Sequence, residues 1–394
     1  GGKGRWWHNV CQKIRQAARA GEADSPKIIV TGCWATMNPQ SAAGLPGVVR
    51  VVPNSEKDRL VSDWLRIPKE TFDLEPLERV PVPGARARTR AFIKVQDGCD
   101  NHCTFCVTTL ARGKSRSRSV EEVIADVRAA LETSRGESAD PEISAGAREI
   151  VLTGVHLGSW GQDLRPRRQL RHLVAAILEQ TSVPRLRLSS LEPWDLQADF
   201  FALWENPRLC RHLHLPLQSG CASTLRRMGR KTTPEAFADL IGSAQAAIPG
   251  VAITTDVIVG FPGEDLQEFT ESLNFVHQMG FAGGHVFVYS PRPGTAAARM
   301  PGQVPHAIRK ERSAQMRLVL SRAAVAYQSR FIGQEAAVLW ERATAFGPSG
   351  WRMSGLTDNY LRIYATVLGR FWNRITPVRL NDLVEGGLAG VVID

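Results

Sequence analysis

Three cysteines lie close together in the chain, at Cys99, Cys103 and Cys106. Their Cys-x3-Cys-x2-Cys spacing places three thiolates on one tight loop, where they can bind three irons of a 4Fe-4S cluster. The fourth iron then lacks a protein ligand and can bind a reactant, as the open position of a catalytic zinc site does. The spacing therefore predicts an iron–sulfur site with redox or radical chemistry.

Zinc sites and disulfides are the other common uses of clustered cysteines. A structural zinc site needs a fourth Cys or His at a matching spacing, and the nearest candidate, His102, lies inside the cluster. Disulfides are disfavoured because the chain has seven cysteines, an odd number, and no secretory signal. Cys210 and Cys221 have no partner at a ligand-like spacing, and we expect both to pack in the core.

The overall composition is that of a large globular protein. The 394 residues are 43% hydrophobic and 22% charged, enough for a large core and one or two smaller domains. The sequence has no apolar run long enough to cross a membrane and no signal peptide, so we expect a cytoplasmic protein. The net charge of +10 favours an anionic partner, and nucleic acid is the commonest large one.

Residues 1–55 are predicted to form a small α/β region. A basic helix is expected over 10–20, and the apolar run 27–31 indicates a buried strand that leads to Cys33. A thiol at the carboxyl end of a strand can be a metal ligand or a buried structural cysteine, and the sequence leaves both interpretations open. Residues 56–88 contain recurring prolines and are predicted to form a linker.

Strands and helices alternate regularly over residues 89–330. The helix after Ser119 begins with a capping box that includes Glu122, and Pro234 starts another helix. Six strands are expected, at 91–95, 149–153, 185–190, 212–215, 252–259 and 284–289. Repeated strand–helix units predict a parallel sheet with helices outside, and six units are too few for a closed eight-stranded barrel. The predicted fold class is therefore α/β, with a partial TIM-like (β/α)6 barrel that ends in a basic helix over 308–331.

Polar residues and glycines follow the expected strands, at the sheet edge where α/β proteins bind ligands. These candidates for cofactor binding are Gly154, Ser190, Glu192, Gln218, Gly260, Gly263 and Glu264. Glycine lets a backbone approach a ligand closely, although a single glycine turn is more often a tight connection. His285 is a further polar candidate. Four cations in residues 112–118 either contact substrate phosphates or form a solvated face.

Residues 331–394 change character and are predicted to form a small all-β barrel. Short β-like runs separated by turns occur at 336–340, 361–365, 378–380 and 390–393. Aromatic residues, with Trp351 and Tyr364 among them, are interleaved with arginines, which suits RNA binding through base stacking and phosphate contacts. The alternative is a β core with a solvated basic rim.

Four motifs resemble those of the radical S-adenosylmethionine (SAM) tRNA methylthiotransferases. They are GCDNHCTFC at 98–106, LTGVHLG at 152–158, HLHLPLQSG at 212–220 and YSPRPGT at 289–295. The resemblance implies an N-terminal methylthiotransferase domain over 1–55, a radical SAM core over 89–330 and a C-terminal TRAM domain that binds tRNA over 331–394. It also implies that the three clustered cysteines hold a 4Fe-4S cluster that cleaves SAM reductively.

Within that family, the motif LSSLEPW at 188–194 resembles the MtaB type. The branch that acts on isopentenyladenosine usually has a His-Pro pair where Glu192 and Pro193 stand. The resemblance implies methylthiolation at C2 of N6-threonylcarbamoyladenosine at position 37 of tRNA, with one SAM as methyl donor and a second as radical source. The implied partners are tRNA and a reductase or a flavodoxin-type or ferredoxin-type electron donor. The alternatives are a sibling enzyme acting on isopentenyladenosine or a ribosomal protein, and an inactive tRNA-binding remnant.

The N-terminal region departs from the family pattern. Family members hold a second 4Fe-4S cluster on three cysteines of the N-terminal domain, and only Cys33 of this chain matches one of them. Cys11 lies too close to Cys33 to match another. Because the chain also begins at Gly1 without a methionine, we expect it to be N-terminally truncated. Such a chain is expected to cleave SAM reductively but to methylthiolate inefficiently.

Overall fold

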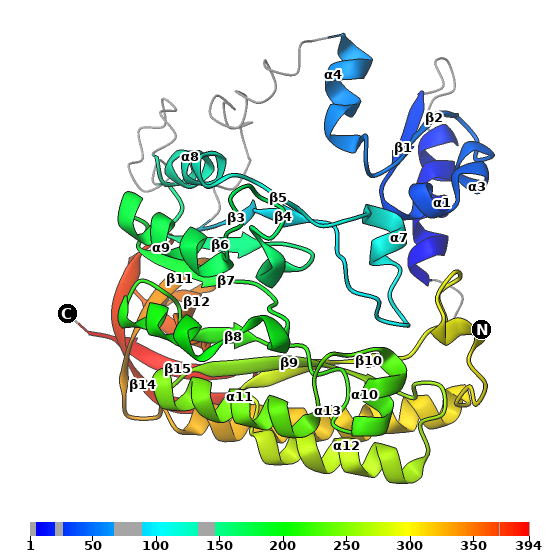
Figure 1. Cartoon of the computed structure of the whole chain (residues 1–394). Helices are drawn as coiled ribbons and strands as arrows, with labels where there is room; N and C mark the ends of the chain where they lie inside the picture. The colour runs from blue at the N-terminus through cyan, green and yellow to red at the C-terminus, as the bar shows by residue number, and fades with distance from the viewer. Residues whose placement is uncertain (1–4, 20–26, 67–88, 133–145, 370, 394) are drawn as a thin grey trace. The chain divides into compact units, whose positions relative to one another are not determined.

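The computed structural model describes residues 5–19, 27–66, 89–132, 146–369 and 371–393 (Figure 1). The chain divides into two compact units. The first consists of Gly1–Arg79, Gly98–Lys114 and Ser290–Ala298, and the second of Val80–Asp97, Ser115–Tyr289 and Arg299–Asp394. The cysteine loop therefore belongs to the first unit and the predicted partial barrel to the second. Most of the predicted linker, from 67 to 88, lies outside the described residues.

The first unit has a small α/β core. Its elements are α1 (Arg5–Arg19), β1 (Ile28–Thr31), α2 (Cys33–Met37), α3 (Pro39–Ala43), β2 (Val48–Val52), a 3-10 turn (Lys57–Arg59), α4 (Leu60–Leu65) and α7 (Thr108–Arg112). Strands β1 and β2 pair in parallel, and Val30, Trp34 and Ala42 form a buried cluster beside them. The predicted basic helix and the buried strand before Cys33 are both confirmed.

The second unit contains six parallel strands within its described residues. They are β3 (Arg90–Lys94), β6 (Glu149–Thr153), β7 (Arg185–Leu188), β8 (His212–His214), β9 (Ala252–Val259) and β10 (Gly283–Val288). They form two three-stranded sheets, β3-β6-β7 and β8-β9-β10. Parallel bridges from Leu186 to Leu209 and from Ser190 to His214 join the two sheets. The predicted partial (β/α)6 barrel is thus confirmed. A short antiparallel pair, β4 (Gln96–Asp97) and β5 (Arg116–Ser117), lies beside it.

Helices cover the outer face of this sheet. They are α8 (Val120–Leu131), α9 (Leu170–Gln180), α10 (Ala222–Met228), α11 (Pro234–Ala247), α12 (Leu266–Met279) and α13 (His306–Ser329), and Figure 1 shows α11, α12 and α13 running beside β8, β9 and β10. The capping box of Ser119 with Glu122 is confirmed at α8, and Pro234 begins α11. Helix α10 was not predicted. Strand β9 buries Val257 and Val259 in the core, whereas alternate residues face the inside of the partial barrel.

Residues 335–392 form a closed barrel in the part of this segment that the structure describes. Its strands are β11 (Glu335–Gly347), β12 (Gly350–Thr357), β13 (Arg362–Val367), β14 (Ile375–Val384) and β15 (Gly387–Val392). The predicted all-β barrel is confirmed, but the sequence prediction missed β12. That strand buries Ser354 and Thr357 as completely as Met353 and Leu356, so its sequence shows no alternation of polar and apolar residues.

A buried ion pair joins the inner face of the sheet to the β-barrel. Arg187 of β7 donates from Nε to Glu149 Oε1 of β6 at 2.7 Å, and both side chains are at most 3% exposed. The same guanidinium donates to the backbone carbonyls of Thr357 and Asp358, at 3.2 and 2.9 Å. Glu149 therefore neutralises the charge of Arg187 within the sheet, and the β-barrel accepts hydrogen bonds from the guanidinium donors that remain.

Aromatic stacking extends the same contact. Tyr360, which has a left-handed backbone with φ of 65°, stacks on His212 with ring centroids 4.4 Å apart and an interplanar angle of 8°. The Arg187 guanidinium carbon lies 5.0 Å from the centre of the Tyr360 ring. Non-glycine residues adopt this backbone region only where the surrounding contacts enforce it. The contact between barrel and sheet is thus specific in geometry as well as in charge.

Within the described ranges, no helix is both long enough and apolar enough to cross a bilayer.

Replacing Glu149 with leucine tests the importance of this ion pair, because it leaves the Arg187 charge buried without its carboxylate. We expect the free energy of unfolding, measured by urea denaturation, to fall by about 3–5 kcal/mol. The control is Glu335→Leu, which removes an exposed ion pair to Arg379 at 2.9 Å and should cost less than about 1 kcal/mol. Similar losses in the two variants would contradict the importance of the buried pair.

Candidate active site

The cysteine loop is closed by a tight backbone crossing. Gly98 has a φ of 77°, and a Cβ atom there would lie 1.9 Å from the carbonyl oxygen of Lys114. Only glycine fits such a position. The amide of Cys99 donates to the carbonyl of Gly113 at 3.0 Å. The two ends of the loop are therefore held together, and the three cysteines lie on the segment between them.

The environment of the three cysteines suits an iron–sulfur cluster. None of the three is in a disulfide, and Cys99 and Cys103 are half-buried whereas Cys106 is exposed. The amide of Asn101 donates to Cys99 Sγ at 3.4 Å, and that of Thr108 donates to Cys106 Sγ at 3.4 Å. Hydrogen bonds to sulfur stabilise cluster thiolates and set their reduction potential. The described residues form no group of three or more His, Cys, Asp or Glu side chains that could hold a single metal ion.

The segment Ser290–Ala298 packs on the cysteine loop within the first unit. The amide of Ala297 donates to the carbonyl of Thr104 at 2.9 Å. A side chain at Gly294 would contact Leu110 of α7 and Met37 of α2. The YSPRPGT motif therefore contributes to the shape of the loop, a role that its sequence alone did not reveal.

Cys33 lies at the start of α2 and is half-buried. Asn54 Nδ2 donates to Cys33 Sγ at 3.2 Å and to the carbonyl of Ala111 at 2.9 Å. Asn54 is itself buried and links the end of β1 to α7, the helix that follows the cysteine loop. Asn54 could not be recognised from the sequence, since no local motif marks it. The role of Cys33 as a metal ligand stays a prediction.

The LTGVHLG motif forms a hydrogen-bonded turn at the end of β6, in the second unit. The amide of His156 donates to Gln96 Oε1 at 2.8 Å, and Gly154 packs against the Gln96 side chain. His156 Nε2 lies 2.6 Å from Asp195 Oδ2, which belongs to the loop after β7. Neither Gln96 nor the pair of His156 and Asp195 was singled out from the sequence. Their positions at the ends of predicted strands are the one sequence feature that could have indicated them.

The GFPGE turn after β9 is braced by a buried ion pair. Glu264 accepts from Gly260 N at 2.8 Å and from Arg312 Nη1 at 2.6 Å. Burial raises the pKa of Glu264, and the hydrogen bonds from Gly260 and Arg312 offset only part of that rise. Gly263, in the same turn, donates to the carbonyl of Gly302. Roles of these residues in cofactor binding stay predictions.

The other predicted strand-end residues include an ion-paired glutamate, a glutamine with an uncommon backbone conformation and a serine in a backbone bridge. Glu192 pairs with the buried Arg230 at 2.6 Å, and the Arg230 guanidinium carbon lies 4.4 Å from the centre of the Trp194 ring. Gln218 has a φ of 72°, an uncommon conformation for a residue with a side chain. Ser190 forms its bridge to His214 through the backbone. The structure thus places all of these residues at strand ends of the second unit.

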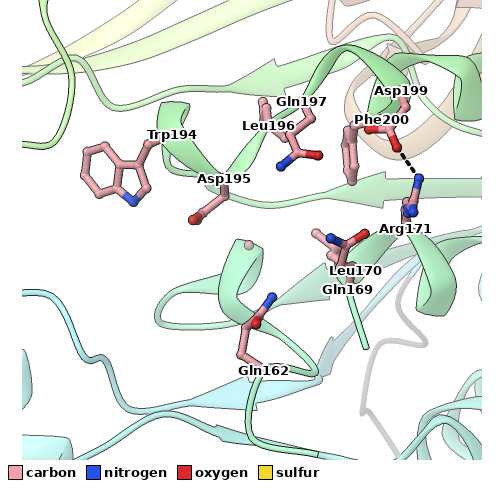
Figure 2. A pocket seen from close by; sticks show the side chains of 11 residues that line it. Gln162, Gln169, Leu170, Arg171, Trp194, Asp195, Leu196, Gln197, Asp199 and Phe200 are labelled. Atoms are coloured by element: carbon pink, nitrogen blue, oxygen red, sulfur yellow. Dashed lines mark hydrogen bonds and ion pairs between the residues drawn. The ribbon is translucent and has the colours of Figure 1, made fainter. Parts of the chain in front are cut away.

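A cavity of about 180 Å³ opens between the loops that follow β6 and β7 (Figure 2). Figure 2 shows Gln162, Trp194 and Asp195 along its wall, and Arg171 paired with Asp199 at one end. Ser189 Oγ and Trp194 Nε1, near the end of β7, are buried without a hydrogen-bond partner among the described residues. Buried polar atoms normally have a partner, so these two suit a polar ligand.

Comparison with known proteins extends these observations. Residues 93–276 match the Radical SAM superfamily. The chain is 37% identical to the threonylcarbamoyladenosine tRNA methylthiotransferase MtaB of Thermotoga maritima, over 92% of this chain and 80% of that protein. It is 35% identical to the MtaB of Bacillus subtilis, over 89% of this chain and 78% of that protein. The chain belongs to the MtaB-type tRNA methylthiotransferases.

Membership of this family decides the enzyme class and the cofactors. The chain is a radical SAM methylthiotransferase, and its cofactors are a 4Fe-4S cluster and SAM. A sibling, the tRNA-2-methylthio-N(6)-dimethylallyladenosine synthase of Desulfitobacterium hafniense, is 33% identical over 77% of this chain and 64% of that protein. The cysteine loop and the strand-end residues described above lie within or beside the matched segment.

Alkylation of the cluster-free, reduced protein tests the environments of the cysteines. Iodoacetamide at pH 8 should label the exposed Cys106 first. Cys210 should remain unlabelled until urea unfolds the protein, because it is 1% exposed and burial raises the pKa of its thiol to about 12. Peptide mass spectrometry reports both rates. Labelling of Cys210 as fast as Cys106 in the folded protein would refute this assignment.

Substituting Gly260 with alanine tests the turn after β9. Its φ is 70°, and a Cβ atom would lie 2.1 Å from Arg309 Cγ, so we expect a loss of roughly 1–3 kcal/mol in the free energy of unfolding. Gly242→Ala, in the exposed part of α11 with nothing within 4 Å of the new Cβ, should instead gain up to about 1 kcal/mol. Thermal denaturation compares the two variants, and a neutral Gly260→Ala would contradict the geometry.

Proposed function

We propose that this protein converts N6-threonylcarbamoyladenosine at position 37 of tRNA to its 2-methylthio derivative. Membership of the MtaB-type family over about nine-tenths of the chain carries this proposal. The carbon–hydrogen bond at C2 of adenine has no useful acidity, so a general base cannot remove its proton. Radical hydrogen abstraction is the suitable route, and a bound cluster with SAM supplies that chemistry.

Cys99, Cys103 and Cys106 are proposed to hold the cluster. The support is their spacing, their free thiols, and the amides that donate to two of the sulfurs. Three ligands leave one iron for SAM. The closure of the loop at Gly98 and Lys114 holds the three thiols on one short segment. Cys33 is proposed to serve an auxiliary cluster.

The strand-end residues of the second unit are proposed to bind SAM. They are Gly154, Ser190, Glu192, Gln218, Gly260, Gly263 and Glu264. The unpartnered Ser189 Oγ and Trp194 Nε1 beside them support a polar ligand at this edge. The braced turn at Gly260 and Glu264 keeps its backbone in one conformation, so that part of the ordering cost of binding is met in advance.

The C-terminal β-barrel is proposed to bind the substrate tRNA, as a TRAM domain over 331–394. The other proposed regions are a methylthiotransferase domain over 1–55, a linker over 56–88 and the radical SAM core over 89–330. Phe346, 69% exposed, packs on Trp351 in the β11–β12 hairpin, and the Arg352 guanidinium lies 5.5 Å from the centre of the Tyr364 ring. An exposed ring such as Phe346, on a hairpin that also carries an arginine, suits stacking on unpaired bases. In the basic run after the cysteines, Arg118 already pairs with Asp126 at 2.6 Å.

The remaining partners follow from the chemistry. A one-electron donor must reduce the cluster, and we propose a reductase or a flavodoxin-type or ferredoxin-type protein. Because the proposed substrate is tRNA, we also propose a cytoplasmic location. The net charge of +10 supports binding to an anionic partner of this kind.

Product analysis with the reconstituted protein tests the function. With SAM, a reductant and tRNA bearing N6-threonylcarbamoyladenosine, we expect mass spectrometry to detect 5′-deoxyadenosine as the main product and the 2-methylthio nucleoside in lower yield. Cys103→Ser should abolish both products, whereas Cys221→Ser, a buried cysteine outside the loop, should retain them. If Cys33 serves the auxiliary cluster, Cys33→Ser should lose the methylthio product and keep 5′-deoxyadenosine.

Other outcomes would overturn the proposal. Methylthiolation of isopentenyladenosine tRNA in place of the threonylcarbamoyl substrate would assign the chain to the sibling activity. If the protein binds tRNA in a salt-dependent way but forms neither product, it is a tRNA-binding protein without this activity.

A further inference from the structure

Three polar side chains meet on the inner face of the second unit, one from each strand of the β8-β9-β10 sheet. Asp256 Oδ2 lies 3.3 Å from His214 Nε2, and Asp256 Oδ1 lies 3.2 Å from His285 Nδ1. The parallel register places His285 directly beside Asp256. Thr254 Oγ1 lies 2.9 Å from His214 Nδ1 and completes the cluster.

The charge state of Asp256 fixes the orientation of both rings. Burial raises the pKa of Asp256, but the hydrogen bonds and charges of His214 and His285 outweigh it, so the pKa lies below its usual value. An ionised carboxylate only accepts hydrogen bonds. His285 therefore donates its Nδ1 proton to Asp256, and its Nε2 points away from this partner.

His285 projects from the inner face of the sheet toward open space. Its neighbours along β10, Val286 and Val288, pack on the core, and a side chain at Gly284 would contact Leu320 of α13. Alternate residues must then face the opposite way. The His285 side chain is 74% exposed, and Phe287 on the same face is 50% exposed, with ring centroids 6.3 Å apart.

Stability alone does not account for this arrangement. Exposed ion pairs contribute about 0–1 kcal/mol, and an exposed phenylalanine beside one contributes less than it would in the core. A partly buried carboxylate that orients an exposed imidazole is instead the usual way to prepare a histidine for a ligand. The exposed Phe287 ring adds a surface on which a base can stack.

We infer that His285, oriented by Asp256, binds the carboxylate of the threonylcarbamoyl group, while Phe287 stacks on the adenine. This inference rests on the proposed function. An enzyme that acts on a base must take it out of the stack and into the protein, which brings the N6 substituent along. That substituent carries a carboxylate, whereas an isopentenyl group carries no charge. A second carboxylate is bound by the doubly protonated ring, in which Nδ1–H donates to Asp256 and Nε2–H donates to the substrate.

A backbone phosphate of the tRNA presents the same anionic oxygens. The carboxylate is favoured because it belongs to the nucleotide that must enter the protein for reaction at C2. Phe287 also lies nearer than His285 to the carboxyl end of β10, so a stacked adenine there leaves its substituent room to extend along the strand toward His285. The experiment separates the two sources.

Binding to three versions of one anticodon stem-loop tests the inference. The RNAs carry adenosine, N6-threonylcarbamoyladenosine or its methyl ester at position 37, and fluorescence anisotropy with the reconstituted protein gives each Kd. We expect the wild type to prefer the free carboxylate over the ester by roughly ten-fold or more, as a charge-assisted hydrogen bond provides. His285→Ala should lose this preference, and His285→Lys, which restores a cation, should recover most of it.

Controls separate reading of the carboxylate from other effects. His277→Ala removes an exposed histidine of α12 and should keep the wild-type preference, and thermal melts with iron content verify folding of each variant. Equal weakening of all three RNAs by His285→Ala would indicate a phosphate contact and overturn the inference. A preference that persists in His285→Ala, or is missing from the wild type, would also overturn it. Product analysis of the wild type tests the proposed function separately. The enzyme can methylthiolate the threonylcarbamoyl substrate even if His285 does not recognise its carboxylate.

Discussion

The buried pair of Arg187 and Glu149 is the interaction on which the second unit depends. Two charges removed from water are stable only if every hydrogen-bonding group around them is satisfied. The strands β6 and β7 supply the two charges, and the barrel loop after β12 supplies backbone carbonyls to the guanidinium. The sheet and the β-barrel are therefore one folded body at this end. Separating them would leave Arg187 with donors that nothing accepts.

Because the β-barrel covers one end of the sheet, a ligand can bind only at the opposite edge. The amino-terminal ends of the strands are filled by Arg187, His212 and Tyr360. The carboxyl ends carry the turn at Gly260 and the cavity beside Trp194. Between these ends the inner face stays polar, through Thr254, His214 and Asp256 to the exposed His285. A sheet with an apolar outer face and a polar inner face can bind a nucleoside without losing its core.

Much of the fold was predictable because its signals are local. Apolar runs marked the six parallel strands, and the capping box at Ser119 marked the start of α8. Strand β12 was missed because it buries Ser354 and Thr357 inside the β-barrel. A strand that is buried on both faces loses the alternation by which strands are recognised.

The candidate site divides in the same way. The cysteine loop could be recognised from the sequence, because three cysteines within a few residues are placed by local geometry and need no distant partner. The sequence also placed Glu192 and Glu264 at strand ends. The pairing of Glu192 with Arg230 and of Glu264 with Arg312 could be seen only in the folded chain. The same holds for the contact of Asn54 with Cys33 and for the position of Asp256 between two histidines. These contacts join residues far apart in the chain, and strand register and packing, which no short motif encodes, bring them together.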